Sequence, residues 1–327
     1  MICLGIESTA HTFGVGIIKE NKILANVKQS YTTKKGGMIP SKASEHHLEA
    51  FEKIIREALY EAGIGLNEVD LIAFSQGPGI GHTLRIGANA ARSLSLLFDK
   101  PIIGVNHCIA HLEIGRMFFD VKNPLLVYLS GANTQIIAYS NGKYRIFGET
   151  LDIGVGNFVD SLARELGLGF PGGPELQKLA EKGDKYINLP YAVKGMDVSF
   201  GGLLTNLKHK IKSGEFKREN IAYSAQETIF AMLMEVTERA MAHCKINEII
   251  LGGGVACNKR LQEMTKIMTK ERGAKCHIPP QALLVDNGAM IAWLGHLIYN
   301  SGISTNIKNS YILPYQRTDD IIASWAH

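Results

Sequence analysis

The sequence predicts an α/β protein built from two related lobes. Apolar runs with strand character alternate with segments whose apolar residues recur at helical spacing, a pattern typical of sheets covered by helices. The strand-and-turn pattern of the N-terminus also returns in residues 124–150. We therefore expect two lobes that share one plan, with the functional site in the cleft between them.

The first lobe is expected to open with strands and to continue with a helix. ICLGIEST (2–9) and FGVGIIKENKILANVKQS (13–30) have the apolar and β-branched content of strands. Residues 44–63 place apolar side chains at helical spacing. We expect Ser44 to cap this helix and Gly63 to end it.

Further strand and helix signals follow along the chain. Residues 70–79 read as a strand that enters a glycine loop, and a helix is expected over 84–98. PLLVYLSGANTQIIAYSNGKYRIFGET (124–150) predicts three strands joined by turns. A strand, a glycine loop and a helix are expected within 248–268.

The division into lobes follows from where the pattern restarts. We expect an N-terminal α/β lobe over 1–125 and a nucleotide-binding α/β lobe over 126–299. The tail, residues 300–327, is expected to pack back on the first lobe. No low-complexity linker separates the two halves, which favours a site between them.

Composition narrows the class of protein. The 327 residues carry a formal net charge of +4, which permits a nucleic-acid or phosphate partner without requiring one. Five scattered cysteines without a CxxC pair predict neither a disulfide framework nor a zinc ribbon, so a cytoplasmic setting is expected. No apolar stretch approaches the ~18 residues of a membrane span, and the N-terminus lacks the pattern of a signal peptide.

The glycine-rich loops differ in what they predict. In GPGIGHTLRIG (77–87), His82 stands where a dinucleotide fingerprint needs glycine, and no Gly-Lys-Ser/Thr follows, so a simple turn is favoured. SGAN (130–133) can present backbone N–H groups to phosphate oxygens, and GGGVACN (252–258) allows close approach to a flat ligand. Together with Asp160 between them, these loops favour a nucleotide cleft.

Two histidines form the most specific candidate metal pair. His107 and His111 lie four residues apart, so on a helix they share one face, and Asn106 is expected to cap that helix. The positive end of the helix dipole is expected to keep their rings neutral. A cysteine replaces the glutamate of the H-E-x-x-H protease motif. On the residues alone, a metal pair and an ordinary helix pair both stay open, whereas His46–His47 is expected on a helix surface.

Eight motifs in order along the chain carry a resemblance to a known family. They are IESTAHTFGVGI, SQGPGIGHTLRIG, NHCIAHLEIG, YLSGANTQ, FPGGPELQKLA, ILGGGVACNKRL, LLVDNGAMIAW and the closing QRTDD. Taken together, they resemble the tRNA N6-adenosine threonylcarbamoyltransferase family in its archaeal and eukaryotic form. That form is the catalytic subunit of the KEOPS complex and was formerly described as an O-sialoglycoprotein endopeptidase. The resemblance runs from residue 2 to about 325.

The resemblance implies a fold of the actin/Hsp70/sugar-kinase (ASKHA) type, one divalent metal, iron or zinc, and ATP or threonylcarbamoyl-AMP, with or without Mg. The metal ligands implied by motif match are His107, His111, Tyr128 and Asp286. The residues expected to contact nucleotide or substrate are Ser8, Thr9, Tyr128, Leu129, Ser130, Gly131, Ala132, Asn133, Asp160, Gly173, Gln177 and Asn258. Gln177 departs from the family pattern, in which this position is usually acidic, and this departure puts the strength of the ribose contact in question.

The activity implied is transfer of a threonylcarbamoyl group from threonylcarbamoyl-AMP to N6 of the adenosine 3′ to the anticodon in tRNAs that read ANN codons. The implied partners are tRNA and KEOPS-type subunits, including a small atypical protein kinase, and no membrane. No general base can be named. Two alternatives stay open: a non-catalytic ATP-binding scaffold that regulates a kinase-containing assembly, and a small-molecule kinase of the same fold.

Overall fold

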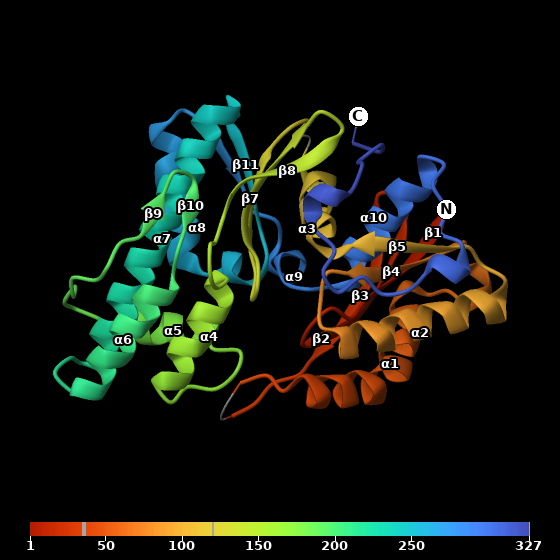
Figure 1. The fold of residues 1–327 in the computed structure, drawn as a ribbon. Helices are drawn as coiled ribbons and strands as arrows, with labels where there is room; N and C mark the ends of the chain where they lie inside the picture. Colours follow the sequence, from red (N-terminus) through yellow and green to blue (C-terminus); the bar gives the residue numbers. More distant parts are fainter. Residues whose placement is uncertain (35–36, 120, 327) are drawn as a thin grey trace.

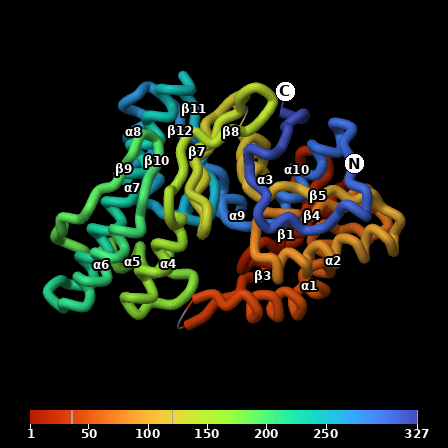
Figure 2. Tube along the Cα trace, in the orientation of Figure 1, coloured from red at the N-terminus to blue at the C-terminus, as the bar shows by residue number. Residues whose placement is uncertain are grey.

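The structure is a computed structural model that describes residues 1–34, 37–119 and 121–326. Its main strands form two five-stranded mixed sheets, and helices lie between the sheets and on their outer faces (Figures 1 and 2). The predicted α/β class is confirmed. Within the described ranges, no helix combines the length and the apolar character that a membrane crossing requires.

Both sheets follow one plan, in which three antiparallel strands continue into two parallel ones. The first sheet, in the order β3-β2-β1-β4-β5, contains β1 (Ile2–Glu7), β2 (Thr12–Lys19), β3 (Lys22–Ser30), β4 (Leu71–Gly77) and β5 (Ile102–Asn106). The second sheet, in the order β8-β7-β6-β11-β12, contains β6 (Leu125–Leu129), β7 (Thr134–Ser140), β8 (Lys143–Glu149), β11 (Glu248–Gly252) and β12 (Lys275–His277). The repeated order accounts for the repeated sequence pattern.

Helices cover both faces of each sheet. The outer helices of the first sheet are α1 (Pro40–Ala62) and α2 (Gly81–Phe98), and α3 (His107–Phe118) and α10 (Gly288–Asn300) lie between the sheets. The second sheet is covered by α4 (Val155–Glu165), α5 (Gly173–Ala180), α6 (Gly201–Ser213), α7 (Arg218–Cys244) and α8 (Lys259–Glu271). Short elements complete the chain: β9 (Val193–Lys194), β10 (Asp197–Val198), α9 (Gln281–Leu284), η1 (Leu66–Glu68), η2 (Gly254–Cys257), η3 (Ile307–Asn309) and η4 (Thr318–Asp320).

The ends of α1 test two expectations. Gly63 ends the helix as predicted, in the left-handed region at φ +67°. The predicted start at Ser44 is wrong, because α1 begins at Pro40 and its N-cap position is Ile39, which offers no side-chain cap. Proline is preorganised for the first helical turn and has no N–H to satisfy there, so the helix starts earlier than the polar cap suggested.

Glycines bring α10 against the first sheet. A Cβ on Gly16 would overlap the backbone nitrogen of Ala289, and a Cβ on Gly5 would overlap that of Ala292. The helix can therefore lie on β1 and β2 only while these positions lack a side chain. Since α10 begins two residues after Asp286, this contact also holds the chain close to that residue.

The tail crosses from one sheet to the other. Leu313 N donates to Gln76 O at 2.7 Å beside the first sheet, and Ala323 N donates to Gly142 O at 2.9 Å beside the second. The tail therefore packs on the body, as expected, and it contacts both halves. The division of the chain into lobes 1–125 and 126–299 stays a prediction. The structure shows that α10, which begins at Gly288, packs on the first sheet.

Candidate metal and nucleotide site

The helix that carries the histidine pair starts where β5 ends. Asn106 is the last residue of β5, and its Oδ1 accepts hydrogen bonds from Cys108 N at 3.0 Å and Ile109 N at 3.1 Å. The predicted cap is therefore confirmed. His107 and His111 follow on one face of α3, and both side chains are buried.

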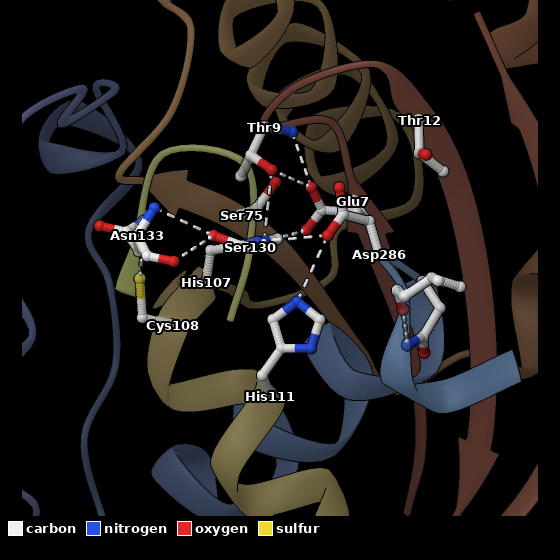
Figure 3. Close-up of polar contacts among 12 residues, drawn as sticks. Glu7, Thr9, Thr12, Ser75, His107, Cys108, His111, Ser130, Asn133 and Asp286 are labelled. Carbon is white, nitrogen blue, oxygen red and sulfur yellow. Dashed lines mark hydrogen bonds and ion pairs between the residues drawn. The ribbon is translucent and has the colours of Figure 1, made fainter. Parts of the chain in front are cut away.

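The two imidazoles converge on one carboxylate. Nε2 of His107 lies 3.5 Å and Nε2 of His111 lies 3.3 Å from Oδ1 of Asp286 (Figure 3). The potential ligand atoms of the three residues all lie within 4.8 Å of one another. Asp286 lies in the loop before α10. The next residue, Asn287, caps this helix, and its Oδ1 accepts a hydrogen bond from Met290 N at 3.0 Å. Two imidazoles and a carboxylate suit a divalent transition metal.

Tyr128 supplies a further oxygen next to this group. It lies in β6 of the second sheet, and its ring centroid is 5.1 Å from that of His111. Its hydroxyl is buried beside Ser130 and Cys108, and within the described residues no partner meets it in hydrogen-bonding geometry. A buried hydroxyl without a partner is costly, so this oxygen is suited to receive a ligand. The donor set therefore fits a metal.

The charges in this group are not those expected from the helix dipole. Burial opposes the charge on the His107 imidazole, but the Glu7 and Asp286 carboxylates outweigh it and raise the pKa to about 9. Burial dominates at His111 and lowers its pKa. Burial disfavours the Asp286 carboxylate, yet its contacts with both imidazoles hold the pKa well below its ordinary value. The lowered pKa of His111 agrees with the expected neutral ring, whereas at His107 the two carboxylates favour the charged form in the metal-free chain.

Glu7 is the site residue that sequence reasoning missed. It ends β1, is fully buried, and its Oε2 lies 2.9 Å from Nδ1 of His107. The only signal in the sequence was a charged residue at the end of an otherwise apolar strand, ICLGIE. Nothing local indicated that a histidine 100 positions further on would lie beside it.

The expected phosphate residues lie on two sides of α3. Thr9 Oγ1 is 3.3 Å from Nδ1 of His107, and Ser8 N donates to Ser75 Oγ at 3.0 Å. On the second sheet, the turn 130–133 closes through Ser130 N and Asn133 O at 2.8 Å. Asn133 Nδ2 also lies 3.8 Å from Cys108 Sγ, beside the histidines (Figure 3). Both sheets thus contribute residues to one site.

The glycine loops allow the backbone to pack closely around this turn. Gly253 has φ +88°, and a Cβ there would overlap the carbonyl of Leu129. Gly156 N donates to Ser130 O at 3.1 Å, and Asn157 N donates to Gly131 O at 2.8 Å, so α4 begins directly behind the turn. Gly131 and Ala132 remain exposed.

The other residues expected to contact the nucleotide form contacts with their own neighbours. Asp160 Oδ1 accepts from Gly172 N at 2.7 Å, next to Gly173 at the start of α5. Gln177 Oε1 accepts from Lys259 N at 3.1 Å. Asn258 Oδ1 caps α8.

Comparisons with known proteins agree with the motif-based resemblance. The family described as tRNA N6-adenosine threonylcarbamoyltransferase matches residues 22–293. A protein of that name from Thermococcus sibiricus is 55% identical over 325 residues, which cover 99% of this chain and 100% of the relative. A "probable bifunctional tRNA threonylcarbamoyladenosine biosynthesis protein" from Methanothermobacter thermautotrophicus is 49% identical over 99% of this chain, which spans 61% of that relative.

Solved structures bear on the fold. The match with HypF from T. kodakarensis covers 95% of this chain and 49% of HypF, at 15% identity and a TM-score of 0.66. The match with (R)-2-hydroxyglutaryl-CoA dehydratase component A from Acidaminococcus fermentans covers 90% of this chain and 97% of that protein, at 16% identity and a TM-score of 0.56. With the repeated sheet order, these matches confirm the expected fold of the actin/Hsp70/sugar-kinase type. The chain belongs to the tRNA N6-adenosine threonylcarbamoyltransferase family, and its expected class, a transferase, is confirmed with it.

Proposed function

We propose that this chain transfers the threonylcarbamoyl group of threonylcarbamoyl-AMP to N6 of the adenosine 3′ to the anticodon in tRNAs that read ANN codons. The observation that carries the proposal is the 55% identity, over the whole length, to relatives named for this reaction. A tRNA substrate also agrees with the cytoplasmic setting expected from the cysteines.

The reaction is an acyl transfer. The N6 amine attacks the carbonyl carbon of the threonylcarbamoyl group, a C–N bond forms, and the bond from that carbon to the phosphate oxygen breaks. AMP leaves, and the nitrogen loses one proton. The chain must therefore hold the adenylate, stabilise negative charge on its phosphate and exclude water.

The metal is proposed to be held by His107, His111, Asp286 and Tyr128. The convergence of two imidazoles on one carboxylate and the unpartnered Tyr128 hydroxyl support this set. Iron or zinc suits the ligands. A bound divalent ion would supply Lewis-acid chemistry, either polarising the acyl carbonyl or neutralising the phosphate.

The phosphate side is proposed to involve Ser8, Thr9 and the turn 130–132, where the exposed Gly131 and Ala132 can present their backbone N–H groups to phosphate oxygens. Leu129 and Asn133 flank that turn. Asp160, Gly173, Gln177 and Asn258 are proposed for the adenosine side. Because Gln177 is an amide, the ribose contact there lacks the charge of a carboxylate. ATP, with or without Mg, is the proposed alternative ligand of the same residues.

The proposed partners beyond tRNA are KEOPS-type subunits that include a small atypical protein kinase. Two observations support this proposal: the motifs match the archaeal and eukaryotic form of the family, and several archaeal relatives carry the word bifunctional in their names.

The test pairs metal analysis with transfer from threonylcarbamoyl-AMP to tRNA, for wild type, His107→Ala and His111→Ala. We expect about one metal ion per chain and activity in the wild type, with both lost in each variant. Transfer at the wild-type rate by metal-free protein would contradict the role of the metal. ATP binding without transfer, in the presence of the partner subunits, would favour the scaffold, and phosphorylation of a sugar would favour the kinase.

A further inference from the structure

Glu7 places a carboxylate at the centre of the molecule, and both of its oxygens are engaged. Oε2 lies 2.9 Å from Nδ1 of His107. Oε1 accepts from Thr9 N at 2.7 Å and from Thr9 Oγ1 at 2.5 Å (Figure 3). The side chain is fully buried. Burying a carboxylate costs several kcal/mol in general unless donors surround it, so these contacts are required for its presence.

The direction of the histidine ring follows from this contact. A carboxylate only accepts hydrogen bonds, so Nδ1 of His107 carries the proton in this pair. The opposite nitrogen, Nε2, then faces Asp286 at 3.5 Å. A carboxylate on the far nitrogen of an imidazole fixes its tautomer and orientation and raises its basicity toward a metal.

The same carboxylate also holds the turn after β1. Thr9 is bound to Glu7 through its amide and hydroxyl, while its carbonyl accepts from Ile80 N at 2.8 Å and from Thr83 Oγ1 at 3.1 Å. The turn is therefore held from both sides. Its attachment to the metal pair runs through Glu7 and through the 3.3 Å approach of Thr9 Oγ1 to His107.

We infer that Glu7 is a positioning residue that orients His107 for metal binding and links the metal pair to the phosphate-side turn at Ser8–Thr9. The inference rests on the proposed function, in which these two sets of residues hold the metal and the phosphate. Glu7 contacts neither directly and acts through His107 and Thr9. Its loss weakens metal binding even when the protein stays folded.

A purely structural role makes a different prediction. If Glu7 only satisfied buried donors, its replacement would lower the free energy of unfolding and leave metal affinity unchanged. Glu113 provides a matched control, because it is also a buried carboxylate, lies on α3 itself, and contacts Tyr144, Arg116 and Trp325 in place of the histidines.

The experiment titrates Co²⁺ alone into wild type, Glu7→Gln, Glu7→Asp and Glu113→Gln, followed by Co²⁺ absorption and by competition with a chelator. We expect Glu7→Gln to weaken Co²⁺ binding roughly 10- to 100-fold and to change the absorption band. Glu7→Asp, which keeps the charge, should recover part of the affinity. Glu113→Gln should bind Co²⁺ as the wild type does while unfolding at lower denaturant concentration.

Affinity within about twofold of wild type for Glu7→Gln would overturn the inference, as would equal losses in Glu7→Gln and Glu113→Gln. If Glu7→Gln fails to fold, Glu7→Asp is the deciding variant. An unchanged Co²⁺ affinity and an unchanged Co²⁺ absorption spectrum in Glu7→Asp would count against the positioning role of Glu7. Nitrogen NMR of the His107 ring tests the contact in the absence of metal. An Nδ1–H signal that is the same in Glu7→Gln as in wild type would also overturn the inference. Transfer to tRNA is measured separately, so failure of the positioning role and failure of the proposed reaction remain distinguishable.

Discussion

Trp325 Nε1 donates a 3.0 Å hydrogen bond to Oε1 of Glu113, so the last turn of the chain reaches the helix that carries both candidate metal ligands. The same carboxylate accepts from Tyr144 OH and pairs with Arg116 at 3.2 Å. Residues from α3, from β8 and from the tail thus meet at one buried carboxylate. The tail is therefore attached to α3 through this carboxylate.

Removing the tail's donor should destabilise the fold measurably. Trp325→Phe keeps an aromatic ring but takes one donor from a buried carboxylate, so we expect the free energy of unfolding to fall by roughly 1.5–3 kcal/mol. Urea unfolding measures the change. Tyr315→Phe serves as the control, because Tyr315 is 94% exposed. Equal stability of the two variants would mean that the Trp325 contact contributes nothing.

Tyr128→Phe should separate folding from metal binding. The hydroxyl is buried and unpartnered within the described residues, so its removal should leave the stability of the metal-free protein unchanged or raise it by about 1 kcal/mol. If the oxygen is a metal ligand, affinity for Co²⁺ should fall in the same variant. Thermal unfolding of metal-free protein and a Co²⁺ titration measure the two effects. A fall in stability without a change in affinity would contradict the ligand role.

Gly16→Ala should disrupt the packing of α10 on β2. The added Cβ would overlap the backbone of Ala289, which no side-chain rotation can relieve, so we expect a loss of at least ~2 kcal/mol or failure to fold. Gly202→Ala is the matched control: nothing lies within 4 Å of a Cβ at this helical position, and alanine there should stabilise by about 0.5–1 kcal/mol. Denaturant unfolding compares them. A Gly16→Ala protein as stable as wild type would show that α10 can shift.

What could be predicted from the sequence was mostly local. The Asn106 cap, the Gly63 stop and the shared face of His107 and His111 depend on residues within a few positions of each other, and the structure agrees. Asp286 entered only through its motif, since 175 positions separate it from His111. Spacing alone could not have found it.

The contacts that sequence reasoning missed join distant segments. Glu7 and His107 meet because β1 and β5 flank β4 in the first sheet, which no periodicity reveals. Glu113 has no local feature that distinguishes it from a surface glutamate on an amphipathic helix. Its burial results from α3 lying between two sheets, a consequence of the whole topology.

The burial of His47 also could not be predicted from local sequence, and it leads to a prediction about the pH dependence of stability. It was expected on the surface of α1 but is fully buried, with its ring centroid 5.6 Å from that of Phe13. Burial, aided by the nearby His46 and His11, lowers its pKa to about 4. The ring is therefore neutral in the folded protein at neutral pH.

Because the folded pKa lies below the ordinary value of 6.5, the unfolded chain binds a proton first as the pH falls. His47 should thus have no effect on stability above pH ~6.5, and it should cost up to about 1.4 kcal/mol per pH unit between ~6.5 and ~4. His47→Gln removes the titrating group, so its unfolding free energy should fall less steeply over this range than that of wild type. His209→Gln, at an exposed position of α6, is the control substitution. Urea unfolding at several pH values measures the slopes, and parallel curves for His47→Gln and wild type would rule out His47 as the source.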